Sequence, residues 1–164
     1  MKRVFFSLFI VLLLLAGAFY FGKLMSPAAK KSLVLSTPLP IIPQIKINDA
    51  TYLLEIADTA QLQQQGLSDR ASLPIDHGML FVFPQKSRQA FWMKDMHFAL
   101  DMIWIDEDTI VDITENVPAP LSPNDKLPIY QPKVAVDKVL EINAGEVKRN
   151  RIYVGQVIKL SIIK

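Results

Sequence analysis

The sequence predicts a mostly β fold of the β-rich α+β class: a small, compact, barrel-like domain with one short helix, preceded by an N-terminal transmembrane or signal helix. From residue 45 onward, many short strand-like runs accompany a single helical pattern, without the strand–helix alternation of a parallel α/β fold. The segments 80–83 and 91–93 are apolar at consecutive positions, which is typical of strands covered on both faces. We therefore expect a closed or partly closed sheet, or a sandwich.

The strand-like runs begin with residues 46–57, where apolar and polar side chains alternate. This alternation predicts a strand or a hairpin with Tyr52, Leu54 and Ile56 on one face. Further apolar runs predict the remaining strands of the sheet. These runs are residues 79–83, 90–94, 102–106, 110–115, 134–142 and 156–163.

Capping residues, turn residues and prolines mark the connections between these runs. Asp58 and Gln61 form a capping-box pattern that begins the short helix, and Gly66 ends it. Residues 106–108 predict a tight hairpin turn. Residues 117–132 contain five prolines and predict a long loop, either ordered or mobile. A turn, with up to one helical turn, is expected around residues 143–151.

The first 22 residues have the features of a membrane anchor. No residue from Val4 to Gly22 carries a charge, and this length is close to the ~20 residues that a helix needs to cross a bilayer. Residues 16–18 resemble a signal cleavage site, but residues 19–21 continue the apolar run, which favours an uncleaved anchor over a cleaved signal. We expect the domain outside the cytoplasm, periplasmic or extracellular, or secreted if the segment is cleaved.

Residues 23–44 predict a spacer, and residues 45–164 the domain. Four prolines without helical or strand periodicity favour an extended spacer. All 16 acidic residues follow the spacer, whereas five of the 18 basic residues precede the domain. An acidic domain without a basic stripe is a poor candidate for binding nucleic acid. The expected partners are the membrane, through the N-terminal segment, and a small ligand, a peptide or an envelope protein. The chain has no cysteine, which excludes disulfides and lipidation of an N-terminal cysteine.

Four charged residues lie within or beside apolar runs and are the main candidates for a polar site. They are Arg70, Lys94, Asp101 and Glu141. A charge on a buried strand is costly unless it is paired or hydrated. Spacing alone favours the simpler interpretation, in which each side chain stands at a strand end with its charge in water. The alternative is a binding site at the rim of the barrel, where the four converge beside Trp92, with Tyr130 of the proline-rich loop as a further contact.

The motifs expected for metal, phosphate or nucleophile chemistry are missing from the sequence. His77 and His97 lack the H-E-x-x-H spacing and the cysteine partners of a zinc site. Asp106, Asp108 and Asp112 lack the glycine and the terminal glutamate of a calcium loop. Neither a glycine-rich phosphate loop nor a G-x-S-x-G nucleophile elbow is present. The sequence therefore predicts no metal and no cofactor.

Six short motifs follow one another along nearly the whole of residues 45–164. They are Gly66-Leu67-x-x-Arg70, Leu73-Pro74, Gly78-Met79-Leu80-Phe81-Val82-Phe83, Phe91-Trp92-Met93-Lys94, Leu100-Asp101 and Leu140-Glu141-Ile142-Asn143-Ala144-Gly145. Together they resemble the bacterial and archaeal family called domain of unknown function 192. The resemblance implies a small β-rich, barrel-like domain, often behind a signal segment, with no established general activity.

Three positions depart from the pattern of that family. Ser68 stands where the family usually has Met, Asp95-Met96 replaces Asn-Thr, and Gly155-Gln156 replaces Gly-Asp. Asp95 places a negative charge next to Lys94. If the family has a polar site there, we expect this chain to bind a different ligand or to bind more weakly.

Three functions remain open at the level of the sequence. The leading hypothesis is a non-catalytic ligand-binding or interaction domain on the outer side of the membrane, because an anchor, a spacer and a β domain occur without a catalytic motif. The first alternative is a hydrolase-like enzyme with Asp101 or Glu141 as general acid or base, and with Lys94 or Arg70 stabilising charge. The second is a purely structural protein that contacts an envelope partner. The sequence leans towards a non-enzymatic role.

Overall fold

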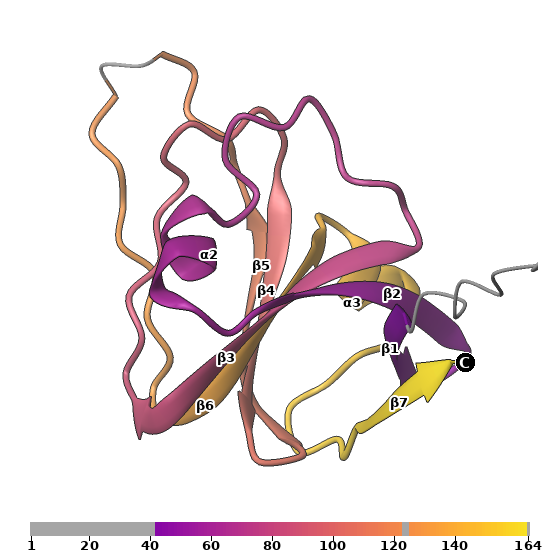
Figure 1. The fold of residues 1–164 in the computed structure, drawn as a ribbon. Helices are drawn as coiled ribbons and strands as arrows, with labels where there is room; N and C mark the ends of the chain where they lie inside the picture. Colours follow the sequence, from indigo (N-terminus) through magenta and orange to yellow (C-terminus); the bar gives the residue numbers. More distant parts are fainter. Residues whose placement is uncertain (1–41, 123–124, 164) are drawn as a thin grey trace, which may run out of the picture. The chain divides into compact units, whose positions relative to one another are not determined.

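The computed structural model describes residues 42–122 and 125–163, which form one seven-stranded sheet with two short helices (Figure 1). The strands are β1 (Ile42–Ile47), β2 (Ala50–Ala57), β3 (His77–Ser87), β4 (Leu100–Asp106), β5 (Thr109–Val117), β6 (Val136–Asn143) and β7 (Lys159–Ile163). The helices are α2 (Ala60–Gln65) and α3 (Glu146–Arg149). The order across the sheet is β5-β4-β6-β3-β2-β1-β7, and only β2 and β3 pair in parallel. The predicted mostly β class is confirmed.

The sheet is open, so the predicted barrel-like closure is wrong. In the described residues, the edge strands β5 and β7 form no ladder, and one isolated bridge joins Thr109 to Val157. The amide of Ile110 donates to the carbonyl of Gln156 (2.9 Å), and the amide of Gly155 donates to the carbonyl of Ile110 (2.7 Å). Gly155 has φ 94°, which no strand residue adopts. The segment before β7 is therefore too irregular to complete a barrel.

Two tight turns form hairpins, one within residues 46–57, where a strand or a hairpin was expected, and one at the predicted turn of residues 106–108. Asn48 (φ 54°) begins the turn between β1 and β2, and Glu107 (φ 55°) begins the turn between β4 and β5. Tyr52 and Leu54 of β2 are buried on the same face, as the alternation indicated. Local sequence patterns located the turn of the second hairpin, whereas for residues 46–57 they left a strand and a hairpin both open.

Helix α2 lies in the connection between the parallel strands β2 and β3, which no tight turn can join. Its N-cap is Thr59 rather than the predicted Asp58, because the Thr59 hydroxyl accepts the amide hydrogen of Leu62 (3.3 Å). Gly66, with φ 50°, ends the helix as predicted. A second short helix, α3, occupies the region where a single helical turn was expected.

Residues 90–94 do not form the predicted buried strand. Phe91 makes only an isolated bridge with Tyr130, and Trp92 is 58% exposed while its neighbour Met93 is buried. The consecutive apolar residues reflect a loop folded over the sheet, with one side chain facing solvent. An apolar run of this length does not distinguish a central strand from such a loop.

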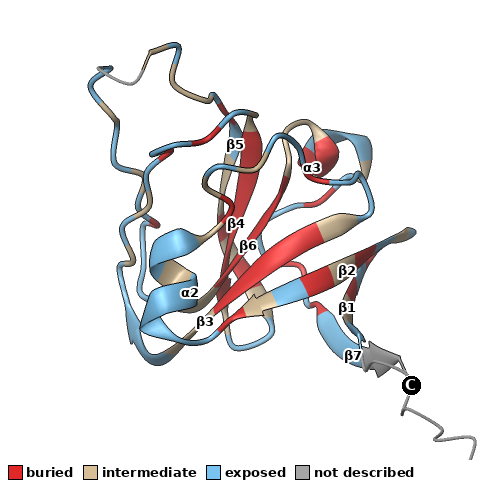
Figure 2. Ribbon diagram, turned by 45° about the horizontal axis from the view of Figure 1, so that its top comes forward, coloured by how far each residue is buried: buried red, intermediate tan, exposed pale blue. Residues whose placement is uncertain are grey.

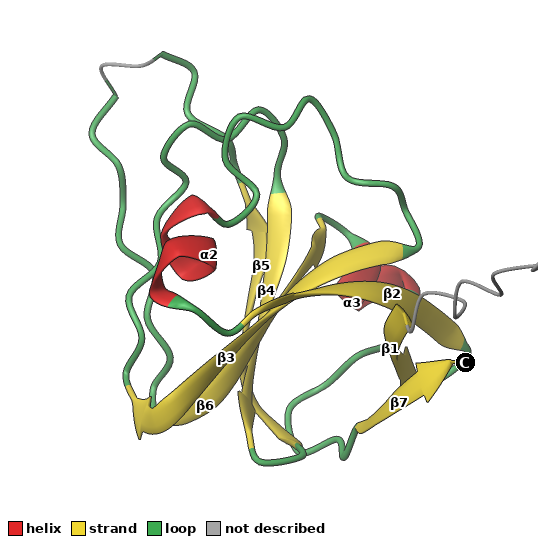
Figure 3. Ribbon diagram, viewed as in Figure 1, coloured by secondary structure: helices red, strands yellow, loops and turns green. Residues whose placement is uncertain are grey.

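Buried residues run along β3, β4 and β6 (Figure 2), and their side chains divide between two clusters, one on each face of these strands. One face belongs to a cluster rich in isoleucine, which includes α3 and is called here the first cluster: Ile45, Ile47, Tyr52, Leu54, Leu80, Ile103, Ile105, Ile110, Leu140, Ile142, Val147, Ile152 and Ile158. The opposite face belongs to the second cluster: Ala57, Leu67, Leu73, Met79, Phe81, Met93, Met96, Leu100, Met102, Trp104, Val117, Val136 and Val139. The two helices lie on opposite sides of the central strands (Figure 3).

The predicted membrane segment, residues 1–22, and residues 23–41 of the predicted spacer lie outside the described residues. Strand β1 begins at Ile42, so residues 42–44 of the predicted spacer belong to the sheet. Within residues 42–122 and 125–163, no helix has the length and apolar character needed to span a membrane.

Candidate functional site

A pocket of about 270 Å³ opens on the second-cluster side of the sheet. Its lining combines the end of α2 and the turn after it, aromatic residues, two methionines and one acid. The lining residues are Gln63, Gln64, Gln65, Gly66, Leu67, Ser68, Phe81, Phe83, Gln89, Ala90, Phe91, Trp92, Met93, Met96 and Glu141. Glu141 is the one ionisable residue among them, so its protonation state decides the charge of the pocket.

One wall of the pocket is held in place by Gln63 and Gly66. The side-chain amide of Gln63 donates to the carbonyls of Ala57 (3.2 Å) and Val82 (2.8 Å), which fixes α2 against β2 and β3. A Cβ atom at Gly66 would lie 3.4 Å from the ring of Phe81, and the φ of 50° is unfavourable for other residues. The chain therefore needs glycine where it turns from the helix onto the aromatic floor.

The opposite wall is the turn 93–96, where the amide of Met96 donates to the carbonyl of Met93 (3.3 Å). The backbone of this turn also accepts two hydrogen bonds from the first wall. The hydroxyl of Ser68 donates to the carbonyl of Lys94 (3.0 Å), and the amide of Asp69 donates to the carbonyl of Asp95 (2.8 Å). The two walls are thus bonded to one another and form one preorganised unit.

Aromatic contacts set the apolar part of the site. Phe91 packs edge-to-face on Phe81 (centroid distance 4.9 Å) and on Trp104 (5.5 Å). Its backbone also exchanges two hydrogen bonds with Tyr130, which ties the proline-rich loop to the pocket. Contacts of this kind stabilise a structure by about 0.5–1.5 kcal/mol each beyond the burial of their area. The aromatic wall is therefore rigid.

Glu141 of β6 supplies the acid of the pocket and lies between Met79 of β3 and Met102 of β4, its partners in the sheet register. The residue is 5% exposed. No hydrogen bond or ion pair reaches its carboxyl group from the described residues. Burial raises the pKa of Glu141 to about 8, so the carboxyl is mostly protonated at neutral pH. A buried carboxyl without a partner that borders an open pocket is a candidate ligand-binding group.

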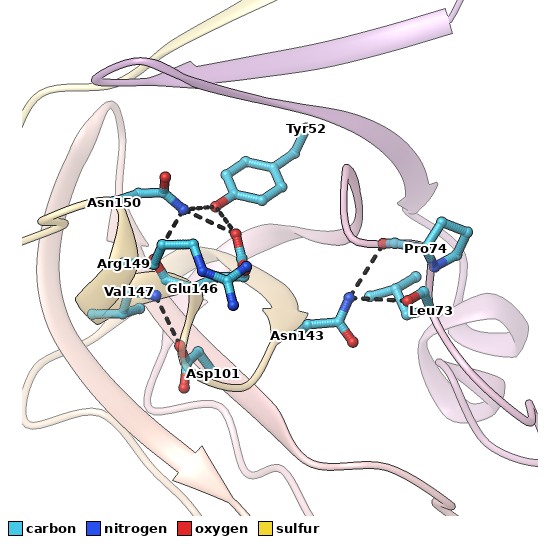
Figure 4. Close-up of polar contacts among 9 residues, drawn as sticks. All are labelled: Tyr52, Leu73, Pro74, Asp101, Asn143, Glu146, Val147, Arg149 and Asn150. Atoms are coloured by element: carbon cyan, nitrogen blue, oxygen red, sulfur yellow. Dashed lines mark hydrogen bonds and ion pairs between the residues drawn. The ribbon is translucent and has the colours of Figure 1, made fainter.

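Two other buried carboxylates lie on the first-cluster side and are fully bonded (Figure 4). Asp101 accepts the amide hydrogens of Asn116 (2.7 Å) and Val147 (2.9 Å). Glu146 accepts from the hydroxyl of Tyr52 (3.1 Å) and also pairs with its helix neighbour Arg149. These carboxylates therefore stabilise the fold.

The side chains around these carboxylates complete the network. The side-chain amide of Asn150 donates to Glu146 (2.9 Å) and to the hydroxyl of Tyr52 (2.8 Å). Burial, and next the negative charge of Glu146, raise the pKa of Tyr52, so its hydroxyl remains a donor over the physiological range. Near the edge of the sheet, the buried Asp112 accepts from the amide and the ammonium group of Lys133. Among the buried acids of the described residues, Glu141 alone has no partner.

The structure brings together some of the residues predicted for a rim site. Trp92 and Glu141 line the same pocket, and Lys94 lines an adjoining hollow that also includes Trp92. The Lys94 side chain is 62% exposed and lies 3.8 Å from Asp95. Tyr130 lines a third hollow, which shares Met93 with the main pocket.

Arg70 and Asp101 line none of these hollows. Arg70 forms a bidentate ion pair with Glu55, in which Nη2 of Arg70 lies 2.8 Å from Oε2 of Glu55. This pairing lowers the pKa of Glu55. Asp101 faces the first cluster, on the opposite side of the sheet from Glu141. The six predicted residues therefore do not form one site.

Neither His77 nor His97 lines the pocket. His77 at the start of β3 pairs with Asp76 (2.8 Å), away from the pocket. Within the residues that the structure describes, no group of three His, Cys, Asp or Glu side chains is placed to hold a metal ion.

Sequence reasoning missed the methionines and the glutamines of the pocket. Met93 and Met96 lie on a wall, and Gln63 fixes α2, yet each is unremarkable in its own segment. The signal available in the sequence was Glu141 in the centre of an apolar run, with methionines in the neighbouring runs. Only the strand order shows that these runs are adjacent.

A family model matches residues 43–160, and it is the model of domain of unknown function 192, described as "Uncharacterized ACR". The chain belongs to this family. The resemblance seen in the short motifs is therefore confirmed, and it carries no assigned activity. The search of curated proteins found no match.

Two solved structures are similar to this member of the family. One is a protein of Sinorhizobium meliloti 1021 described as a candidate transcription regulator, 32% identical, with a TM-score of 0.62, covering 73% of this chain and 92% of that one. The other is a protein of unknown function from Novosphingobium aromaticivorans DSM 12444, 26% identical, with a TM-score of 0.63, covering 76% of this chain and 89% of that one. The described fold is thus shared by two solved proteins.

Proposed function

We propose that the domain is a non-catalytic ligand-binding module whose site is the Glu141 pocket, held on the outer side of the membrane by its N-terminal segment. One observation carries the proposal. Glu141 is buried and has no partner in the described part of the chain, and it borders an open pocket. An unpaired buried carboxyl destabilises the fold, and a ligand that bonds to it removes this penalty.

The lining indicates the chemistry of the ligand. The rings of Phe81, Phe91 and Trp92 accommodate an apolar body, and Glu141 accepts one positively charged group or hydrogen-bond donor. A cation that enters the pocket favours the ionised carboxylate, so binding releases the proton of Glu141. Affinity for a cation therefore rises with pH as the carboxyl ionises.

One observation favours an enzymatic role, but the residues that would stabilise charge or activate a nucleophile are not in place. The raised pKa of Glu141 suits a general acid or base near neutral pH. However, Arg70 and Lys94, the residues suggested for charge stabilisation, do not line the pocket. The hydroxyl of Ser68, which does line it, is bonded to a backbone carbonyl rather than to a base. Binding without turnover fits this arrangement better.

The proposal is tested with benzylammonium as a probe, since it combines one ring with one cationic group. The full-length protein is labelled with ¹³C at the methionine methyl groups and held in detergent micelles. We expect benzylammonium to shift the signals of Met93 and Met96, which line the pocket. Glu141→Gln is expected to weaken this binding about tenfold, because a neutral amide oxygen replaces the negatively charged acceptor of the ammonium group.

Benzyl alcohol has the same shape without the charge and serves as the matched control. It should bind the wild type and Glu141→Gln equally. The signal of Met25, which precedes the domain, should not move with either probe. If neither compound shifts Met93 or Met96, or if Glu141→Gln binds benzylammonium as well as the wild type does, the proposed function is wrong.

A further inference from the structure

The methionines of the domain are distributed unevenly between its two clusters. The described residues contain Met79, Met93, Met96 and Met102, and all four are buried in the second cluster. The first cluster contains no methionine and is built mainly from isoleucine, leucine and valine. Methionine is an ordinary filler of irregular cores, but that role does not by itself confine it to one face.

The four methionines all neighbour Glu141, either in the sheet register or in the lining of the pocket. Met79 and Met102 stand directly opposite Glu141 on the two neighbouring strands, where side chains share a face about 4.5–5.5 Å apart at Cβ. Met93 and Met96, from one hydrogen-bonded turn, line the pocket together with Glu141. Two strands and one turn thus place four methionines beside Glu141, and two of them, Met93 and Met96, line the pocket with it.

Thioether sulfur is a soft, neutral ligand that binds Cu(I) and has little affinity for Mg²⁺ or Ca²⁺. Those hard cations need about six oxygen ligands, and Glu141 is the single acid lining this pocket. We propose that the pocket binds one soft monovalent cation, Cu(I), through the carboxylate of Glu141 and the thioethers of Met93 and Met96. The inference rests on the proposed function in that the pocket must accept a cation.

The charge balance favours a monovalent ion. The Glu141 carboxyl releases one proton to solvent when the ion binds, and the carboxylate and Cu(I) together are neutral. A divalent ion would leave a net positive charge among buried apolar side chains, which is costly. No electron is transferred, and the only bonds exchanged are the O–H bond of the carboxyl and the bonds of the incoming ion.

The test uses the full-length protein with ¹³C-labelled methionine methyl groups, and Ag(I) as an air-stable probe of the same charge and softness. One equivalent of Ag(I) should shift the signals of Met93 and Met96 and release one proton per chain at pH 7. Cu(I), supplied under argon against a chromogenic chelator, should bind with the same stoichiometry. Glu141→Gln should abolish proton release and weaken binding at least about tenfold.

Matched variants separate ligation from packing. Met93→Leu with Met96→Leu keeps the apolar volume and should lose tight binding, whereas Met25→Leu, outside the domain, should bind as the wild type does. The inference is overturned if Ag(I) shifts only Met1 or Met25, or if the double variant retains wild-type affinity. If benzylammonium enters the pocket and Ag(I) does not, the proposed function stands and the Cu(I) site does not. If neither enters, both are wrong.

Discussion

The two faces of the central strands bury carboxyl groups in opposite ways. On the first-cluster side, Asp101 and Glu146 receive donors from the backbone, from Tyr52 and from Asn150. On the second-cluster side, Glu141 receives none from the described residues and borders a pocket. The same functional group thus has two different roles on the two faces. A carboxyl with all its bonds made holds a fold together, whereas one without bonds is available to a ligand at a cost in stability.

The largest expected difference between the faces is the pH dependence caused by Glu141. Burial raises the pKa of Glu141 in the folded state to about 8, from an ordinary value of 4.5. Below pH 4.5 the carboxyl is protonated in both states, so it does not affect stability. Between pH 4.5 and pH 8 only the unfolded chain releases the proton, so the folded state loses stability as pH rises, and above pH 8 the loss is complete.

Glu141→Gln removes this pH-dependent penalty. The wild type should lose about 4 kcal/mol relative to the variant between pH 5 and pH 9, at ~1.4 kcal/mol per pKa unit. Urea unfolding of both full-length proteins at pH 5, 7 and 9 measures the difference. Glu115→Gln, at an exposed position of β5, is the control and should follow the wild type. Parallel pH profiles for the wild type and Glu141→Gln would show that Glu141 is solvated or paired after all.

Asp101→Ala tests the opposite side of the sheet. The change leaves the amides of Asn116 and Val147 without their acceptor, and the expected loss of stability is about 2–4 kcal/mol at neutral pH. Urea midpoints at pH 7 measure it, with Glu115→Ala as the exposed control. A rim-site role for Asp101 implied that its mutation leaves the fold intact. A loss of less than about 0.5 kcal/mol would restore that interpretation.

Lys94→Met should have the smallest effect. Its side chain is 62% exposed, and its ion-pair distance to Asp95 is 3.8 Å. Surface pairs of this kind contribute about 0–1 kcal/mol, so we expect the midpoint of thermal unfolding to stay within a degree or two. If Lys94 were one of the polar residues that stabilise the sheet, as the purely structural interpretation requires, the midpoint would fall clearly. Arg88→Met, which loses a hydrogen bond to the carbonyl of Pro132 (2.9 Å), provides the comparison for a bonded cation.

Much of the fold could be predicted because its information is local. The alternation in 46–57 predicted the buried face of β2, Gly66 predicted the end of α2, and residues 106–108 predicted the turn of the second hairpin. The strand predicted over 90–94 failed because apolar residues in a loop that covers a sheet have the same composition as a central strand. The prediction of a closed sheet also failed. Closure depends on whether the two edge strands pair with one another, and their own sequences do not determine this.

The candidate site was predictable only in part. Glu141 could be selected because a charge within Leu140–Ile142 must lie on a buried strand, and Trp92 was placed beside it. Asp101 has the same sequence signature, but α3 brings an amide to its carboxylate from 46 residues away. Whether a buried carboxyl finds a donor is decided by the tertiary structure. For the same reason the four methionines could not be associated with Glu141 in advance.

The pairing of β1 with β7 protects the sheet against self-association. β1 lies between β2 and β7, with Ile45 aligned to Leu160, so β7 and not β1 is the edge strand at this side of the sheet. A protease that trimmed β7 would uncover the backbone of β1, which carries two buried isoleucines. An exposed strand of this composition can pair with another chain. β7 therefore limits aggregation, because it occupies the hydrogen-bonding groups of β1.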